Sequence, residues 1–258
     1  MSGKPPIVVK VGGGALAGSA LEDLPQLLES GHPVVIVHGG GQQLTRMLDA
    51  LGIVSSFHEG LRVTDAATLE IAEMVFAGSV NKALVRELDG LGVPAVGISG
   101  TDGPTLVVTP VSGLGRVGDV AKVRPDLVQA LWSGGFVPVI APLGLGPEGA
   151  YNVNADSAAA ALAGGLEAGH LFLLTDVDGL LAEGAPVRSL VPEECEEYVE
   201  SGLAVGGMVP KLRAAAQAAR GGVRARILNG NTRGALAAAV AGEEVGTLIF
   251  EGAATCRQ

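Results

Sequence analysis

Short runs of valine, isoleucine and leucine recur along the chain, and each run ends in glycine before a segment with helical periodicity. PIVVKV precedes ALEDLPQLLES, and PVVIVHGGG precedes QQLTRMLDALG. The pattern returns in VPAVGISG, FVPVIAPLG, HLFLLTDVDG and ARILNG. Apolar strands that alternate with helices are typical of a mostly parallel sheet that helices cover on both faces. The sequence therefore predicts an α/β fold rather than a β-sandwich.

One stretch near the middle departs from this pattern. Residues 104–120, PTLVVTPVSGLGRVGDV, alternate differently and contain turn glycines, which predicts antiparallel strands inserted into the fold. No linker rich in proline, serine or charge divides the 258 residues, so we expect one large domain or two closely packed lobes. A soft boundary is expected near residues 154–168, where a helix that starts at the NAD segment joins the two halves.

The composition argues against several classes of function. The chain has 17 Lys and Arg against 27 Asp and Glu, a net charge of −10, and only 3% aromatic residues. These values disfavour nucleic-acid and anionic-membrane partners. The start MSGKPP does not look like a signal peptide, and no run approaches the roughly 20 apolar residues that span a bilayer. Cys195 and Cys256 lie far apart and are expected to be reduced thiols, which predicts a cytoplasmic protein.

Two glycine-rich turns at the ends of predicted strands indicate an anion site. Lys10 stands inside an apolar strand that ends on Gly12 to Gly14, and Gly39 to Gly41 follow the next strand. A glycine turn that leads into a helix offers unpaired N–H groups to phosphate or carboxylate oxygens, although glycine also serves tight packing. Two such turns, one with a lysine, favour the anion site, and His38 is expected to help hold the second turn. The P-loop and dinucleotide-binding glycine motifs are absent, so any nucleotide must use another framework.

Polar residues also gather in YNVNADSAAAALAGG, residues 151–165. Asp156 falls in the first turn of an alanine-rich helix, where a capping role would be ordinary. Asn152 and Asn154 are two residues apart on an extended segment, so they face the same side. Capping accounts for one of these three residues, which leaves the others to grip amide and carboxylate groups of a ligand.

Three further motifs carry charge at predicted turns. Lys211 follows the glycine pair of GGMVPK and falls in the first turn of a predicted helix. A positive charge there opposes the helix dipole, which indicates that the lysine is directed towards a phosphate. Arg62, between predicted short strands in GLRVTD, is suited to bind a carboxylate through two hydrogen bonds. Asp176 and Gly179, in LLTDVDGLL, form either a simple turn or part of a nucleotide pocket.

The inventory of these motifs favours phosphoryl transfer. The four histidines have no metal-binding spacing, and no G-x-S-x-G nucleophile motif occurs. Lysines, backbone donors and one aspartate are what phosphoryl transfer requires, because its catalysis is mainly positioning and charge stabilisation.

Taken in order, VVKVGGGAL, VIVHGGG, GLRVTD, EMVFAGSVNK, NVNAD, LLTDVDGLL and GGMVPK resemble motifs of the acetylglutamate kinases in the amino acid kinase family. The resemblance implies a three-layer α/β/α sandwich with a mostly parallel central sheet. Residues 1–160 would form an N-lobe for the amino acid and for dimerisation, and residues 161–258 a C-lobe for ATP. The implied reaction is ATP-dependent phosphorylation of the side-chain carboxylate of N-acetyl-L-glutamate, in arginine biosynthesis, with no covalent enzyme intermediate.

The resemblance also implies roles for the candidate residues. Lys10 and Lys211 would flank the γ-phosphoryl group, and Asp156 would hold both lysines in place. ATP would bring Mg²⁺ with it, and the chain would form a homodimer. Because only MSGKPP precedes the first strand, the resemblance further implies a dimer insensitive to arginine. The substrate would contact Gly40, Gly41, Arg62, Asn152 and Asn154, and the phosphoryl group and ATP would contact Gly12, Gly13, Asp176, Gly179, Leu181, Leu203 and Val205.

Several alternatives stay open at this point, of which aspartate, glutamate, carbamate and uridylate kinases are the more distant ones within the same fold. A kinase for carrier-bound aminoadipate in lysine biosynthesis shares the fold, although GLRVTD favours acetylglutamate. A non-catalytic amino-acid or nucleotide sensor on the same fold would not need Lys10, Asp156 and Lys211 together. An oxidoreductase that binds a dinucleotide is disfavoured by the missing glycine fingerprint.

Overall fold

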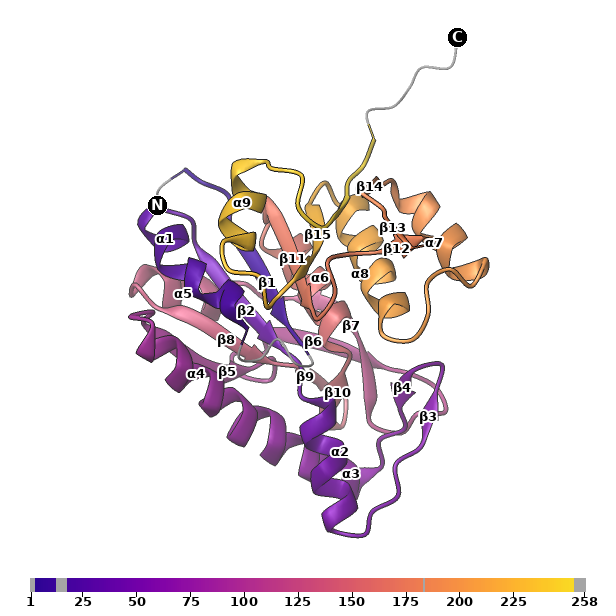
Figure 1. Cartoon of the computed structure of the whole chain (residues 1–258). Helices are drawn as coiled ribbons and strands as arrows, with labels where there is room; N and C mark the ends of the chain where they lie inside the picture. Colours follow the sequence, from indigo (N-terminus) through magenta and orange to yellow (C-terminus); the bar gives the residue numbers. More distant parts are fainter. Residues whose placement is uncertain (1–2, 13–17, 183, 253–258) are drawn as a thin grey trace.

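A large twisted sheet forms the centre of the molecule, with β1 near its middle (Figure 1). The computed structural model describes residues 3–12, 18–182 and 184–252. Within these ranges eight strands form the sheet, in the order β14-β16-β15-β11-β1-β2-β8-β5, and all neighbours are parallel except β15 and β16. The strands are β1 (Ile7–Val11), β2 (Val34–His38), β5 (Ala95–Ser99), β8 (Val137–Ala141), β11 (His170–Thr175), β14 (Ser189–Leu190), β15 (Arg224–Asn229) and β16 (Thr247–Ile249).

Helices cover both faces of this sheet, because its strands are apolar on both sides. In β1, Val8 packs into the core on the face that α6 and α8 cover, whereas Ile7 and Val9 pack into the core under α1, α4 and α9. This confirms the predicted three-layer α/β fold. The helices on the first face are α5 (Asp126–Ser133), α6 (Ala155–Gly165), α7 (Pro192–Glu200) and α8 (Met208–Arg220), and on the second η2 (Ser19–Asp23), α1 (Leu24–Glu29), α4 (Asn81–Gly90) and α9 (Ala235–Ala241).

The predicted antiparallel insertion is confirmed, and it is larger than expected. β6 (Leu106–Pro110) and β7 (Val117–Val123) pair in antiparallel fashion, with a register shift between Val107 and Val108. In the described residues, β9 (Leu143–Gly146) and β10 (Gly149–Val153) close these strands into a small barrel of four. The insertion places β10 directly before α6, so the NVNAD segment runs from the barrel into the helix.

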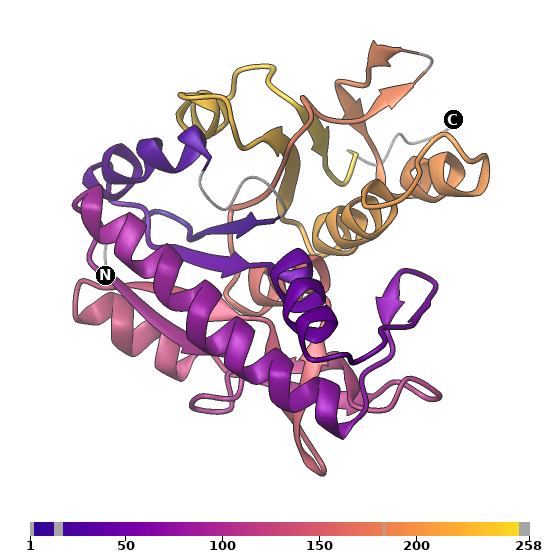
Figure 2. The same ribbon diagram turned by 60° about the horizontal axis from the view of Figure 1, so that its bottom comes forward.

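One long helical segment runs through three elements, as Figure 2 shows. α3 (Ala66–Glu73) is followed by the π-helical η3 (Met74–Val80) and then by α4. The wider turns of a π-helix change which side chains face the core, and such segments often occur at functional sites. The apolar residues of η3 pack against α2 (Gly41–Ala50), the helix that follows the second glycine turn.

Among the described residues, two small hairpins lie outside both the main sheet and the barrel. β3 (Phe57–His58) and β4 (Leu61–Arg62) precede the long helical segment, so Arg62 lies within the second short strand. β12 (Leu181–Ala182) and β13 (Ala185–Pro186) follow β11. Across the described parts of the chain, no helix is both long enough and apolar enough to span a membrane.

Candidate active site

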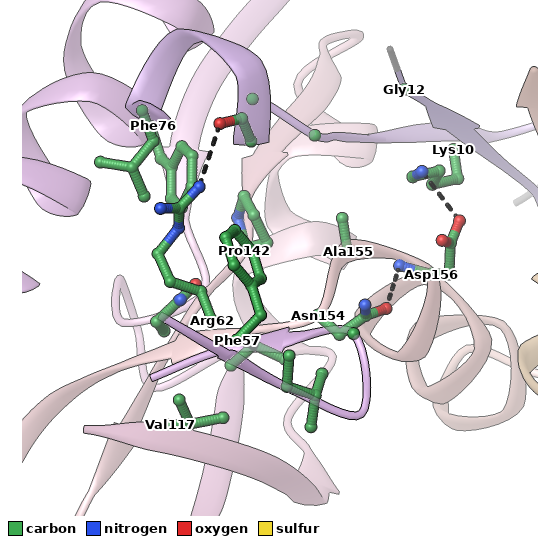
Figure 3. Close-up of a pocket in the computed structure, with 18 residues that line it drawn as sticks. Lys10, Gly12, Phe57, Arg62, Phe76, Val117, Pro142, Asn154, Ala155 and Asp156 are labelled. Atoms are coloured by element: carbon green, nitrogen blue, oxygen red, sulfur yellow. Dashed lines mark hydrogen bonds and ion pairs between the residues drawn. The ribbon is translucent and has the colours of Figure 1, made fainter. Parts of the chain in front are cut away.

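A pocket of about 230 Å³ lies where the carboxyl ends of β1 and β2 meet the amino end of α6 (Figure 3). Ligands of open α/β sheets bind at this end of the strands. We call it the central pocket. Figure 3 shows Arg62 on one side of it and the pair of Lys10 and Asp156 on the other. Its lining residues are Lys10, Gly12, Gly39 to Gly41, Leu44, Phe57, Gly60 to Arg62, Phe76, Val117, Pro142 and Asn152 to Asp156.

Lys10, Asp156 and Lys211 meet beside this pocket although they are far apart in the sequence. Lys10 has the same strand parity as Val8, so its side chain points to the face that α6 covers. Its Nζ lies 2.8 Å from Asp156 Oδ1, and Lys211 Nζ lies 3.7 Å from Asp156 Oδ2. One buried carboxylate thus lies between two ammonium groups.

Burial changes the pKa of Lys211 more than any neighbouring charged group does. Desolvation lowers its pKa from the usual value, and the nearby ammonium of Lys10 lowers it further. Asp156 and, more weakly, Asp176 act in the opposite direction. The two lysines and Arg62 against one aspartate leave this region locally positive, although the whole chain carries −10. That local charge suits an anionic ligand.

Gly12 lines the pocket and has a steric reason to be glycine. A Cβ at this position would collide with the Nζ atom of Lys10, so any larger residue would displace the ammonium group from Asp156. Gly13, which the resemblance assigns to the phosphoryl group, lies outside the described residues.

The second glycine turn is tied to the first strand and to the long helical segment. The Gly39 N–H donates to the Val11 carbonyl at 2.7 Å. A Cβ at Gly40 would lie 2.9 Å from the ring of Phe76, so the ring and the turn are in close contact. Gly40 is the N-cap of α2 and makes no side-chain capping bond, which leaves the first N–H groups of α2 available to an anion.

Arg62 is buried and lies at the opposite side of the pocket. It donates to the Oγ of Ser55 and, at 2.6 Å, to Thr45 Oγ1, and its guanidinium stacks 4.6 Å from the centre of the Phe57 ring. Burial lowers its pKa from the usual value, with Asp49 acting in the opposite sense. An arginine held in this way is suited to bind a carboxylate.

The two asparagines line the pocket, but they differ in what they do. Asn154, rather than Asp156, is the cap of α6, because its Oδ1 accepts from the backbone N–H groups of Asp156 and Ser157 at 2.9 and 3.0 Å. Asn152 donates to Thr64 Oγ1 at 3.1 Å. The cap therefore leaves the Asp156 carboxylate for the two lysines, which explains why all three polar residues occur together.

Apart from Gly12 and Gly13, the residues assigned to the phosphoryl group and ATP lie in the C-terminal half. Asp176 directly follows β11 and is exposed. Gly179 packs closely against Thr247, because a Cβ added at Gly179 would lie 2.6 Å from the Oγ1 atom of Thr247. The assigned apolar side chains are open to solvent. Leu181 is 48% exposed, Leu203 45% and Val205 70%, which is unusual for apolar residues and suits contact with a flat ring.

Several pocket residues were not found from the sequence. Phe57, Phe76 and Pro142 supply apolar surface to the pocket, and they come from a hairpin, a π-helical segment and the end of β8. Phe76 occurs in EMVFAGSVNK, a motif that contributes to the resemblance without a role for any of its residues. That motif was the available signal for Phe76.

Comparison with known proteins gives one consistent result. The sequence profile of the amino acid kinase family matches residues 5–229. The acetylglutamate kinase of Rubrobacter xylanophilus is 69% identical over 243 residues, which cover 94% of this chain and 96% of that protein.

Two solved structures share the fold over nearly all of the chain. The smu.665 protein of Streptococcus mutans has a TM-score of 0.84 and 28% identity, with 95% of this chain and 98% of that one covered. The N-acetylglutamate synthase of Neisseria gonorrhoeae, in complex with coenzyme A and N-acetyl-glutamate, has a TM-score of 0.82 and 28% identity, with 96% and 60% covered. The chain belongs to the amino acid kinase family.

Proposed function

We propose that the chain is an acetylglutamate kinase, which transfers the γ-phosphoryl group of ATP to the side-chain carboxylate of N-acetyl-L-glutamate in arginine biosynthesis. The observation that carries this proposal is the 69% identity, over 94% of the chain, with the acetylglutamate kinase of Rubrobacter xylanophilus. Cytoplasmic location, which an ATP-dependent biosynthetic step implies, is part of the same proposal.

In the proposed reaction, a carboxylate oxygen forms a bond to the γ-phosphorus while the bond from that phosphorus to the bridging oxygen of ADP breaks. The acceptor is already an anion at neutral pH, so no proton has to be removed from it. This fits a site whose charged groups are lysines rather than a general base. Lys10 and Lys211 would stabilise the charge on the phosphoryl oxygens, and Asp156 would hold their ammonium groups apart at fixed positions.

The acceptor would lie in the central pocket. Arg62 would bind its α-carboxylate, and Asn152 and Asn154 would bind its other polar groups. Backbone N–H groups at Gly40 and Gly41 would reach the reacting carboxylate and the phosphoryl oxygens. The apolar surface of Phe57 and its neighbours in the pocket suits the methyl and methylene groups of such a substrate.

The nucleotide would bind across the C-terminal half, residues 161–258, with the amino acid bound by residues 1–160. Support comes from the exposed apolar residues Leu181, Leu203 and Val205 and from the position of Asp176 near Lys211. Gly12 and Gly13 would border the phosphoryl group, and Gly179 would shape the turn below the nucleotide. Mg²⁺ would enter bound to the ATP phosphates, since it retains water readily and prefers phosphate oxygens to a cage of protein ligands.

A homodimer is the proposed assembly. β5 is an edge strand of the sheet, and β8 is the only strand in the described chain that pairs with it, while side chains of α4 donate to its Gly97 and Ile98 carbonyls. An open edge of this kind is normally covered or paired. A second copy of the chain would cover it.

The test is acyl-phosphate formation in the presence of ATP and Mg²⁺, trapped with hydroxylamine. N-acetyl-L-glutamate would be compared with glutamate, aspartate and N-acetyl-aminoadipate, and chelation of Mg²⁺ should abolish the product. A strong preference for N-acetyl-L-glutamate is expected. Preference for another acid would keep the reaction and overturn the substrate, and no product from any acid would favour a non-catalytic sensor.

A further inference from the structure

A buried hydrogen-bond network lies directly beneath the second glycine turn. His38 and Asn81 are both 0% exposed, and they come from the end of β2 and the start of α4. His38 Nδ1 lies 2.6 Å from the Gly39 carbonyl, and its Nε2 lies 3.2 Å from Asn81 Nδ2. The sequence led us to expect that His38 helps to hold this turn, whereas Asn81 has been given no role so far.

The surroundings of Asn81 fix the orientation of its amide. Its Nδ2 also faces the carbonyls of Val139 at 2.9 Å and Ile98 at 3.3 Å, and its Oδ1 accepts from Lys82 Nζ at 3.0 Å. Carbonyls can only accept and an ammonium can only donate, so the amide nitrogen must face His38.

This orientation in turn fixes the tautomer of His38. Its Nε2 accepts from the Asn81 amide, so the proton must be on Nδ1, which donates to the Gly39 carbonyl. Burial lowers the pKa of His38 to about 4, and the charge of Lys82 acts in the same direction. The imidazole is therefore neutral and makes two directed hydrogen bonds, one of them to the glycine turn.

The π-helical segment η3 brings a second support to the same turn. Phe76 lies within η3 and contacts Gly40, and Asn81 is the first residue after η3 and contacts His38. Phe76 therefore contacts the turn directly, whereas Asn81 reaches it through His38. Gly97 on β5 leaves room for this arrangement, because a Cβ there would overlap the Oδ1 atom of Asn81.

We propose that His38 and Asn81 are positioning residues, which hold the turn of Gly39 to Gly41 so that its backbone N–H groups point at the reacting anion in the central pocket. Neither side chain is among the lining residues of the central pocket; both would act through the glycine turn. The expected effect on kcat rests on the proposed function. The claim that the two side chains hold the turn rests on the hydrogen bonds alone.

Three variants remove the support in different ways. Asn81→Ala removes the amide, and Gly97→Ala displaces it while leaving its chemistry unchanged. His38→Leu removes both hydrogen bonds of the imidazole, whereas His38→Asn keeps a donor for the Gly39 carbonyl. The matched control is Leu88→Ala, which opens the core two turns further along the same helix, away from the turn.

The kinetic readout is kcat against KM in the acyl-phosphate assay. Asn81→Ala, Gly97→Ala and His38→Leu should each lower kcat about 10- to 100-fold, since misplacement by about 1 Å has effects of this size. KM for ATP should change less than about threefold, because the nucleotide site is not involved. His38→Asn should recover most of the lost kcat. Leu88→Ala should lower the melting temperature while keeping kcat within about threefold.

The structural readout is nuclear magnetic resonance of the ¹⁵N-labelled protein. His38 should be a neutral imidazole protonated at Nδ1, and the Gly40 and Gly41 amide signals should shift in Asn81→Ala but not in Leu88→Ala. Protonation at Nε2, or unmoved glycine signals, would overturn the proposal.

The two readouts separate this proposal from the proposed function. Unchanged kcat in both Asn81→Ala and Gly97→Ala, or an equal loss of kcat in Leu88→Ala, would also overturn the positioning role. If the unaltered protein formed no acyl phosphate from N-acetyl-L-glutamate, the proposed function would fail. The ¹⁵N measurements would then still decide whether the network holds the turn.

Discussion

Asp156 determines how the two lysines present their charge. Its carboxylate is buried and pairs with Lys10 at 2.8 Å and with Lys211 at 3.7 Å. A buried carboxylate without a partner is strongly destabilising, so each lysine also compensates the charge of Asp156. The contacts that, in our proposal, order the ammonium groups for a phosphoryl ligand also tie α6 to β1 and α8.

Replacing either lysine should remove most of the activity and leave a folded protein. We expect Lys10→Ala and Lys211→Ala each to lower kcat roughly 10²- to 10³-fold, the range for loss of one preorganised donor to a developing negative charge. Each variant keeps one ammonium group for Asp156, so circular dichroism should show a native spectrum. The measurement is kcat in the hydroxylamine assay. Normal turnover by either folded variant would contradict the assignment.

The pH dependence of the activity should report on Lys211. Burial lowers its pKa below 10.5, so the ammonium loses its proton at a lower pH than an exposed lysine does. The neutral amine cannot offset phosphoryl charge, so kcat/KM, which reports the free enzyme, should fall as pH rises through that lowered pKa. In Lys211→Arg the remaining activity should lose this alkaline decline, because a guanidinium stays charged. An identical decline in both proteins would show that another group titrates.

At the level of elements, the π-helical η3 connects the glycine turn to the long helical segment. Its Phe76 ring lies against Gly40, and its apolar residues pack on α2. The turn is therefore held between the sheet on one side and a helix of unusual pitch on the other.

This contact predicts the effect of a single added methyl group. Gly40→Ala should lower kcat and the melting temperature together, because its Cβ would lie 2.9 Å from the Phe76 ring. Gly40→Ala/Phe76→Leu should recover part of both losses, since the smaller side chain gives way. Recovery should be incomplete, because the φ of +157° at Gly40 is itself unfavourable for alanine. If the double variant had the same kcat and melting temperature as Gly40→Ala, the contact with Phe76 would not be the cause of the losses.

Local patterns predicted the main elements well. The apolar runs gave β1, β2, β5, β8, β11 and β15, and the glycines after them marked the end of the sheet that carries the pocket. The closure of the small barrel by β9 and β10 was not predicted, because strand pairing there depends on contacts between distant segments. The same is true of η3, whose pitch depends on packing rather than on local sequence.

For the candidate site, the sequence indicated which polar residues lie at strand ends, but it did not show which structural role each of them has. Asn154 and Asp156 are both good caps by propensity, and only the structure shows that Asn154 caps α6. Asn81 carries no signal of its own, because its partners on β2, β5 and β8 are brought to it by the fold.

At the scale of the whole molecule, the open edge at β5 leads to a prediction about assembly. Sedimentation equilibrium should give twice the 25.8 kDa mass of the chain. In hydrogen exchange, the backbone amides of β5 that face away from β8 should be protected in the dimer. A monomeric mass across the concentration range, or rapid exchange along that edge, would count against pairing through β5.

The central place of β1 has a consequence for synthesis on the ribosome. β1 pairs on one side with β2, which follows closely, but on the other side with β11, at His170–Thr175. At roughly 5 to 20 residues per second, the chain needs on the order of ten seconds or more to add β11 after β1 has formed. During that interval the nascent chain exposes an apolar strand edge, interrupted only by Lys10. The residue proposed for phosphoryl transfer would then also be, before the fold is complete, a charge that discourages pairing with other chains.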